Sequence, residues 1–168
     1  MKAASALAAI AVALALQTTL ASFAIRGTAA LDLVLIVVVY FSLISGPIVG
    51  LLLGSVAGLV QDALSSGIIG IGGLAKTIVG FAAGVLGTQF ILTAPLSRFL
   101  VFVMMTVLHA TIFMGLYVLL DLRQFDAPYT AVLSQAVGNG FLGVVGGQLV
   151  ELIPGQRARR RAQRAARH

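Results

Sequence analysis

The chain has 168 residues, of which 60% are hydrophobic and only 10% are charged, and it contains no Cys. Soluble domains carry about 25% charged residues, so an ordinary water-soluble enzyme is excluded, and without Cys there are no disulfides, thiolate metal sites or Cys nucleophiles. The net charge of +6 comes from arginines near the C-terminus, which disfavours a DNA-binding fold, because such folds spread their cations over a surface.

Six apolar segments follow one another along the chain. A membrane helix needs roughly 20 mainly apolar residues, and most of the segments approach or exceed that length. We therefore predict an all-α, polytopic membrane protein with a compact bundle of six transmembrane helices, and five spans as the alternative. The segments are residues 4–25, 31–45, 47–64, 74–93, 97–120 and 129–153.

The second and third segments are separated only by Gly46-Pro47. Proline removes an amide donor and disfavours helix at the residue before it. One continuous helix of about 32 residues would be about 48 Å long, against a hydrocarbon core of about 30 Å. We therefore expect two short helices, tilted or partly buried, as in many transport folds.

The chain divides into a transmembrane bundle, residues 1–154, and a basic tail, residues 155–168. Six spans place both termini on one side, and the positive-inside rule makes that side the cytoplasm. The first segment has signal-peptide features, with small residues at Ser22 and Ala24, but we expect it to be retained as the first span. We expect the tail to lie on anionic lipid by charge, or to act only as a topology determinant. Its basic residues are Arg157, Arg159, Arg160, Arg161, Arg164 and Arg167.

A glycine stripe opens the third segment: Gly46, Gly50, Gly54 and Gly58 recur at every fourth position. Residues four apart share one face of a helix, and small residues let membrane helices approach closely. We favour internal helix packing for this stripe. A partner interface or a pathway wall is the functional alternative.

The next step of the stripe is Asp62, which follows Gln61 and precedes a Gly/Ser turn. Lys76 opens the next helix, near the outer face in the six-span topology. Acidic residues near the end of a span either cap the interface or carry a function. Asp62 and Lys76 either form an ion pair across the loop or are solvated separately.

The last segment carries a polar or small face at intervals of four residues, which should look into the bundle or onto a partner. A path for protons or a solute along this face is a more specific interpretation, and we favour it less. His109 lies in the middle of its span, where we expect a hydrogen bond to a neighbouring helix rather than a proton relay. The members of the face are Gln135, Asn139, Gly143, Gly147 and Glu151.

Motifs of enzymes and of cofactor sites are missing from the sequence. It has no HExxH, no metal-ligand spacing, no Walker loop and no GxSxG. We therefore expect no catalytic residue, no metal and no cofactor, and a protein that is not an enzyme. The tail has no aromatic residues for base stacking, so we expect no nucleic-acid partner.

One stretch, residues 46–84, resembles the signature region of the bacterial rod shape-determining MreD family. The family pattern is approximately GxxxGxxxGxxxGLxQD, a Gly/Ser turn, and LGxxxLxKxxxG. Residues 16–20 and Asp32-Leu33 also match, whereas Leu31 replaces a frequent proline. The matching residues of the later part are Gly58, Leu59, Gln61, Asp62, Gly70, Leu74, Lys76 and Gly80.

The resemblance implies a non-enzymatic inner-membrane scaffold of cell-wall elongation, with helix packing as its mechanism. It implies binding to MreC, and through MreC links to MreB and to the glycosyltransferase–transpeptidase synthase of the lateral wall. It also implies a fold similar to the substrate-binding component of energy-coupling-factor transporters. A small-solute binding subunit of such a transporter is the alternative function. The residues expected to support the scaffold are Gly46, Gly50, Gly54, Gly58, Gln61, Asp62, Lys76 and Gly80.

Overall fold

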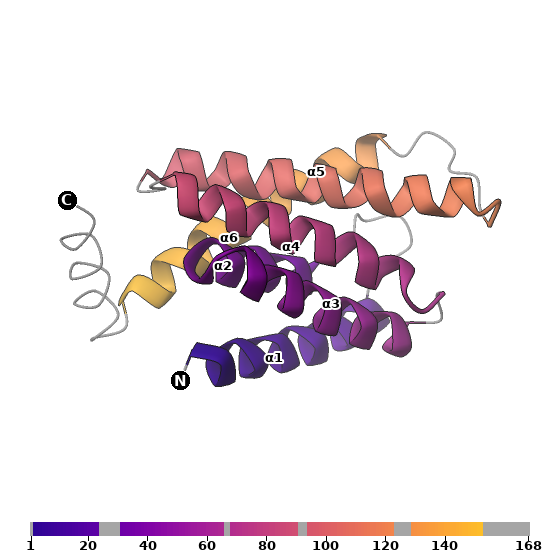
Figure 1. Cartoon of the computed structure of the whole chain (residues 1–168), viewed down its shortest axis with the longest axis horizontal. Helices are drawn as coiled ribbons and strands as arrows, with labels where there is room; N and C mark the ends of the chain where they lie inside the picture. The colour runs from indigo at the N-terminus through magenta and orange to yellow at the C-terminus, as the bar shows by residue number, and fades with distance from the viewer. Residues whose placement is uncertain (1, 24–30, 66–67, 91–93, 123–128, 153–168) are drawn as a thin grey trace.

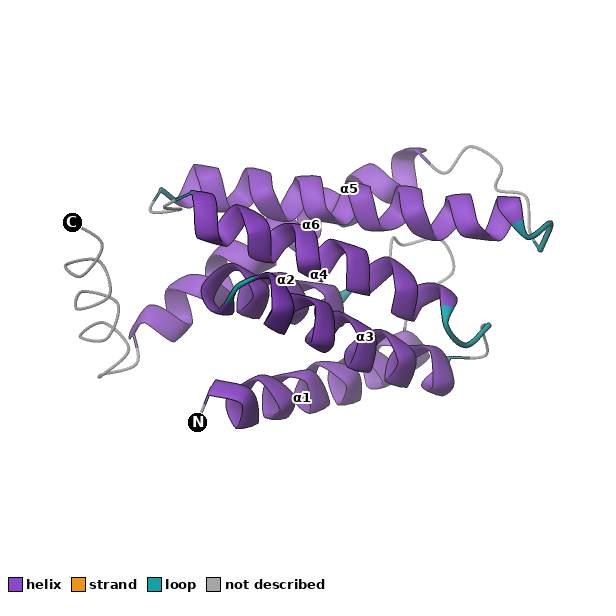
Figure 2. Cartoon of the chain, in the orientation of Figure 1, coloured by secondary structure: helices purple, strands orange, loops and turns teal. Residues whose placement is uncertain are grey.

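The computed structural model describes residues 2–23, 31–65, 68–90, 94–122 and 129–152, and these ranges are mostly helical and contain no strand (Figures 1 and 2). The all-α prediction is therefore confirmed. The helices begin and end within four residues of the predicted segments. They are α1 (Lys2–Phe23), α2 (Leu33–Ser45), α3 (Pro47–Leu64), α4 (Ile71–Gln89), α5 (Pro95–Leu119) and α6 (Tyr129–Leu152).

The predicted break at Gly46-Pro47 is confirmed. Gly46 has a φ of 93°, which side chains other than glycine rarely adopt, and Pro47 takes the first position of α3, where its missing N–H is not needed. α2 and α3 fold back on each other: a Cβ on Gly50 would lie 2.6 Å from the Ser42 hydroxyl oxygen. With 13 residues, α2 is about 20 Å long, shorter than the hydrocarbon core.

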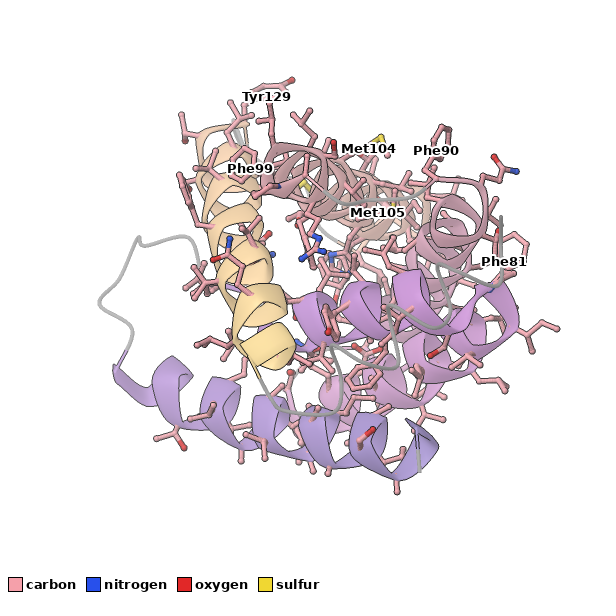
Figure 3. The ribbon with its side chains drawn as sticks, turned by 90° about the vertical axis from the view of Figure 1, so that its left-hand side faces the viewer. Phe81, Phe90, Phe99, Met104, Met105 and Tyr129 are labelled. Atoms are coloured by element: carbon pink, nitrogen blue, oxygen red, sulfur yellow. The ribbon has the colours of Figure 1, made fainter. Side chains whose placement is uncertain are left out.

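Among the described residues, α3, α4 and α5 are each long and apolar enough to cross a membrane. Large apolar side chains cover the outside of the bundle, as expected for a surface in contact with lipid. Figure 3 shows Phe81, Phe90, Met104 and Tyr129 pointing outward, and each is between 46% and 75% exposed. The neighbouring Met105 points inward and is 3% exposed. α1 begins and α6 ends at the same end of the bundle (Figure 1).

The glycine stripe of α3 packs on a second row of glycines in α4. A Cβ on Gly50 would overlap the carbonyl oxygen of Gly80, and a Cβ on Gly54 would overlap the carbonyl oxygen of Lys76. At the next turn, a Cβ on Gly58 would lie 2.6 Å from the Cα of Gly73. The two backbones therefore approach to a distance that only glycine permits at these positions.

α2 is the central helix of the bundle. One buried cluster joins its Val34 and Val38 to α1 and α3, and a second joins its Leu35 and Val39 to α4 and α5. All four side chains are at most 1% exposed. The shortest helix thus connects the two halves of the core.

Candidate functional site

The interior of the bundle holds a cluster of polar side chains, which we call the buried polar cluster. It brings together the residue that caps α2, one residue of α4, two of α5 and one of α6. Each is at most 7% exposed. Its members are Asp32, Lys76, Thr106, His109 and Asn139.

Asp32 and Lys76 form its charged centre. The Lys76 ammonium nitrogen lies 2.8 Å from Oδ2 of Asp32, and the side chains of Lys76 and Asp32 are 4% and 6% exposed. The other carboxylate oxygen of Asp32 accepts a hydrogen bond of 2.9 Å from the amide of Leu35 and caps α2. Asp32 therefore neutralises Lys76 and satisfies the first turn of α2 at the same time.

This ion pair corrects both predictions for Lys76, because it neither pairs with Asp62 nor is solvated at the outer face. Asp62 instead caps the start of α4, where its Oδ2 accepts hydrogen bonds from the amides of Gly70 (2.9 Å) and Gly73 (3.0 Å). With this cap, α4 begins at Ile71, three residues before the predicted start, and Lys76 lies one turn inside the helix. Lys76 then belongs to the buried face of α4, where only Asp32 is in reach as a carboxylate among the described residues.

His109 makes the hydrogen bond to a neighbouring helix that its position predicted. Its Nε2 lies 3.2 Å from the Lys76 ammonium nitrogen. An ammonium group only donates, so Nε2 is the acceptor. The imidazole also stacks on Phe113, one turn further along α5, with ring centroids 5.9 Å apart and planes 24° apart.

Asn139 connects α6 to the rest of the cluster. Its carbonyl oxygen accepts from the Asp32 amide at 3.2 Å, and its amide donates to the Thr106 hydroxyl at 3.3 Å. Thr106 donates in turn to the carbonyl of Phe102 at 2.8 Å. The hydrogen bonds therefore continue from α6 through Asp32 to α4, and from α6 through Thr106 to α5.

The polar face expected on the last helix points partly into the bundle. Asn139, Gly143 and Gly147 are buried, and Gln135 is half-buried. Glu151 belongs to α6, but its side chain lies outside the described part of the structure, as do all six arginines of the tail and the predicted boundary at residues 154 and 155.

Gln61 lies beside the Asp62 cap, on the last turns of α3. Its side-chain oxygen is buried and has no hydrogen-bond partner in the described part of the chain. Nearby, the Ser55 and Thr77 hydroxyls join α3 to α4 at 2.7 Å. The signature residues therefore concentrate at the α3–α4 contact, and Lys76 alone reaches from that contact into the buried polar cluster.

The cluster is suited to hold helices together rather than to bind a metal. Lys76 and Asp32 balance each other's charge, and the other members contribute neutral hydrogen-bonding groups. The described ranges contain no group of three or more His, Asp or Glu side chains placed to hold a metal ion. Polar groups buried in a membrane bundle are expensive unless they pair with one another, as these do.

Sequence reasoning missed the roles of Asp32 and Thr106 in this cluster. The signal for Asp32 was available: an acid directly before the Val-rich run of α2 is a helix cap, and a lysine within an apolar helix needs a buried counter-charge. Thr106 carried no comparable signal, because a threonine in a membrane helix is commonly satisfied by its own backbone.

Among known protein families, the model of rod shape-determining protein MreD matches residues 3–145 of this chain. Comparison with curated proteins and with solved structures returned no match. The matched range contains the glycine contact of α3 and α4, the Asp62 cap and every member of the buried polar cluster. Because the match covers most of the 168 residues, the chain belongs to the MreD family of rod shape-determining proteins.

Proposed function

We propose that this protein is an integral scaffold of the cell-wall elongation machinery in the bacterial inner membrane. In this role it binds MreC, and through MreC it is linked to MreB and to the glycosyltransferase–transpeptidase synthase. Both of its termini face the cytoplasm. The observation that carries the proposal is the family match over residues 3–145, since the family determines rod shape.

The structure supports a scaffold through its packing. A scaffold must present a surface of constant shape, and two features hold this bundle in shape: the glycine contact between α3 and α4 and the buried polar cluster between α2, α4, α5 and α6. The glycine stripe faces α4 over its length, so it is covered within the chain. Gly50, Gly54 and Gly58 therefore contribute to partner binding by fixing how α3 sits on α4, and the outer surfaces of the helices make the contact.

The face of α3 opposite the stripe is apolar and exposed. Ile48, Leu52 and Val56 are 74%, 57% and 49% exposed. A surface of this kind is suited to lipid or to a membrane helix of a partner. In the proposed function, displacing α3 from α4 moves this face and weakens the binding of MreC.

The test compares two glycines that differ only in their surroundings. Gly54→Leu places a side chain against the backbone of Lys76 and Thr77, whereas a Cβ on Gly115 of α5 meets nothing within 4 Å. We expect Gly54→Leu to abolish co-purification with MreC and to leave rod cells round when it replaces the native copy. Gly115→Leu is expected to retain both.

Asp62→Ala is the second variant, because it removes the cap of α4 without adding bulk. We expect it to reduce MreC co-purification less than Gly54→Leu does. If rod shape and MreC binding both survive Gly54→Leu and Asp62→Ala, the proposed mechanism is wrong. Normal rods after complete depletion of the protein would contradict the scaffold function itself.

A further inference from the structure

Gln61 carries a buried hydrogen-bond acceptor that the protein itself leaves unpaired. Among the described residues, its Oε1 is the only buried side-chain oxygen or nitrogen atom without a hydrogen-bond partner. Buried polar atoms in native proteins are nearly always paired, because an unpaired one lowers the stability of the fold. A group of this kind calls for a partner from outside the chain.

The hydrogen-bond donors on the neighbouring turns are already engaged. The Ser65 hydroxyl donates to the backbone carbonyl oxygen of Gln61 at 2.8 Å. The amides of Gly70 and Gly73, at the start of α4, both donate to Asp62. None of these donors can turn to the Gln61 side chain without breaking a bond that it already makes.

Gln61 lies within the membrane-spanning length of α3, where water is not available to pair it. The residue is about 21 Å along the helix axis from Pro47, in a helix about 27 Å long. The hydrocarbon core of a bilayer is about 30 Å thick, and it holds no water that could bond to a polar group. A donor for Gln61 therefore has to come from another component of the membrane.

An exposed apolar row leads to the turn that carries Gln61. Val56, Val60 and Leu64 recur at intervals of four residues, and they are 49%, 41% and 58% exposed. Gln61 follows Val60 directly and is half-buried. Its long side chain can turn the amide outward about its own torsions, without any movement of α3. A helix that packs on this row can therefore reach the amide.

Lipid tails bring no hydrogen-bond donor to this depth, whereas the helix of another membrane protein can. Asn, Gln, Ser and Thr side chains form such bonds between membrane helices. We propose that Gln61 is a hydrogen-bonding contact for the membrane helix of the partner, which packs on the row of Val56, Val60 and Leu64 and offers a donor at the depth of Gln61. The contact presupposes the proposed scaffold function, because the partner is MreC. An amide that costs stability in the free protein is then retained for a bond that is made only in the complex.

Opposite effects on stability and on binding distinguish this role from a structural one. The side chain of methionine is close to that of glutamine in length and lacks the amide, so Gln61→Met removes the unpaired acceptor without opening a cavity. We expect this variant to raise the thermal unfolding midpoint of the full-length protein in detergent micelles by about 2–4 °C, as followed by circular dichroism. We expect it to weaken the affinity for fluorescently labelled MreC, titrated in the same micelles, by about three- to tenfold.

Gln17 of α1 provides the matched control, because it is a half-buried glutamine whose side-chain oxygen is paired. That oxygen accepts a hydrogen bond of 3.3 Å from the amide of Val34 at the start of α2. Gln17→Met should therefore lower the unfolding midpoint by about 2–4 °C. It should change the affinity for MreC by less than about twofold, since α1 is not part of the proposed contact.

A spin label reports on the proposed contact without altering Gln61. The chain has no Cys, so Leu64→Cys and Leu100→Cys each accept a single nitroxide label. Leu64 belongs to the exposed row, whereas Leu100 is 56% exposed on α5. We expect the addition of MreC to immobilise the label at position 64 and to leave the label at position 100 mobile.

Three results would overturn the proposal: a lower unfolding midpoint or loss of folding in Gln61→Met, an unchanged affinity of Gln61→Met for MreC, or an unaffected label at position 64. A lower midpoint with unchanged affinity would mean that the amide is paired within the free protein, by a bound water or by a rearranged side chain. If the wild-type protein does not bind MreC, the proposed function fails, whereas the unfolding midpoint of Gln61→Met is measured without MreC.

Discussion

The ion pair between Lys76 and Asp32 makes the most specific prediction for stability. Lys76→Met removes the cation and leaves the Asp32 carboxylate without its counter-charge. Asp32→Asn removes the anion and leaves Lys76 uncompensated, while the asparagine oxygen still accepts from the Leu35 amide and caps α2. The two substitutions are close in shape to the native residues, so they test charge more than packing.

The magnitude follows from distance and burial. The charged atoms are 2.8 Å apart, and the side chains are 4% and 6% exposed, so water does not replace a lost partner. Removing one partner of a buried ion pair costs about 3–5 kcal/mol. Removing both charges is often nearly neutral, so we expect the double variant to lie within about 1 kcal/mol of the wild-type protein. The losses of the two single variants are thus strongly non-additive.

The assay is reversible unfolding in detergent micelles, with SDS as denaturant and circular dichroism as the signal. Asp121→Asn is the control: Asp121 is exposed after the end of α5, and its positive φ of 52° is one that asparagine tolerates. We expect this control to change the free energy of unfolding by less than about 0.5 kcal/mol. Additive losses in the double variant, or single losses below about 1 kcal/mol, would refute the reasoning.

Three further predictions use the same unfolding assay. Gly50→Ala should destabilise the bundle by about 1–3 kcal/mol, because its methyl group meets the Gly80 carbonyl, whereas Gly115→Ala should be neutral or slightly stabilising. Asp62→Ala should cost about 1–2 kcal/mol through the lost cap of α4, and Asp62→Asn should recover most of it. Asn139→Leu should cost about 1–3 kcal/mol by leaving the Asp32 amide unpaired, with a smaller loss for Thr106→Val.

Each of these predictions has an outcome that contradicts it. Equal effects of alanine at Gly50 and Gly115 would mean that the α3–α4 contact relaxes to admit a methyl group. If Asp62→Asn is as unstable as Asp62→Ala, the hydrogen bonds to Gly70 and Gly73 are not the source of the loss. An unchanged stability of Asn139→Leu would show that α6 does not depend on its polar contacts.

Much of the fold could be predicted because local sequence determines it. The six helices follow from six mainly apolar segments, and the break at Gly46-Pro47 follows from the backbone limits of those two residues. The period of the glycine stripe identifies one face of α3. It does not say that α4 covers that face, and the structure supplies this through Gly80 and Gly73.

The ion-pair partner of Lys76 could not be predicted from the residues near it in the sequence. Asp62 is nearer in the sequence, but it lies in the last turn of α3. There its carboxylate accepts hydrogen bonds from the amides at the start of α4. Asp32 is distant in the sequence, and it reaches Lys76 because α2 packs beside α4 over much of its length. Which carboxylate meets which ammonium group depends on how helices align, and helix alignment is a property of the packed bundle.

The enclosed position of α2 also bears on how the protein is made. α2 is too short to cross a bilayer alone, and the acid before it meets its lysine only on α4. During synthesis, Asp32 emerges well before Lys76, and Asn139 emerges later still. The buried contacts of α2 and of Asp32 are therefore complete only after α4, α5 and α6 have been synthesised. Nascent chains truncated before Lys76 should be cleared by membrane proteases, while chains that extend past Asn139 should persist.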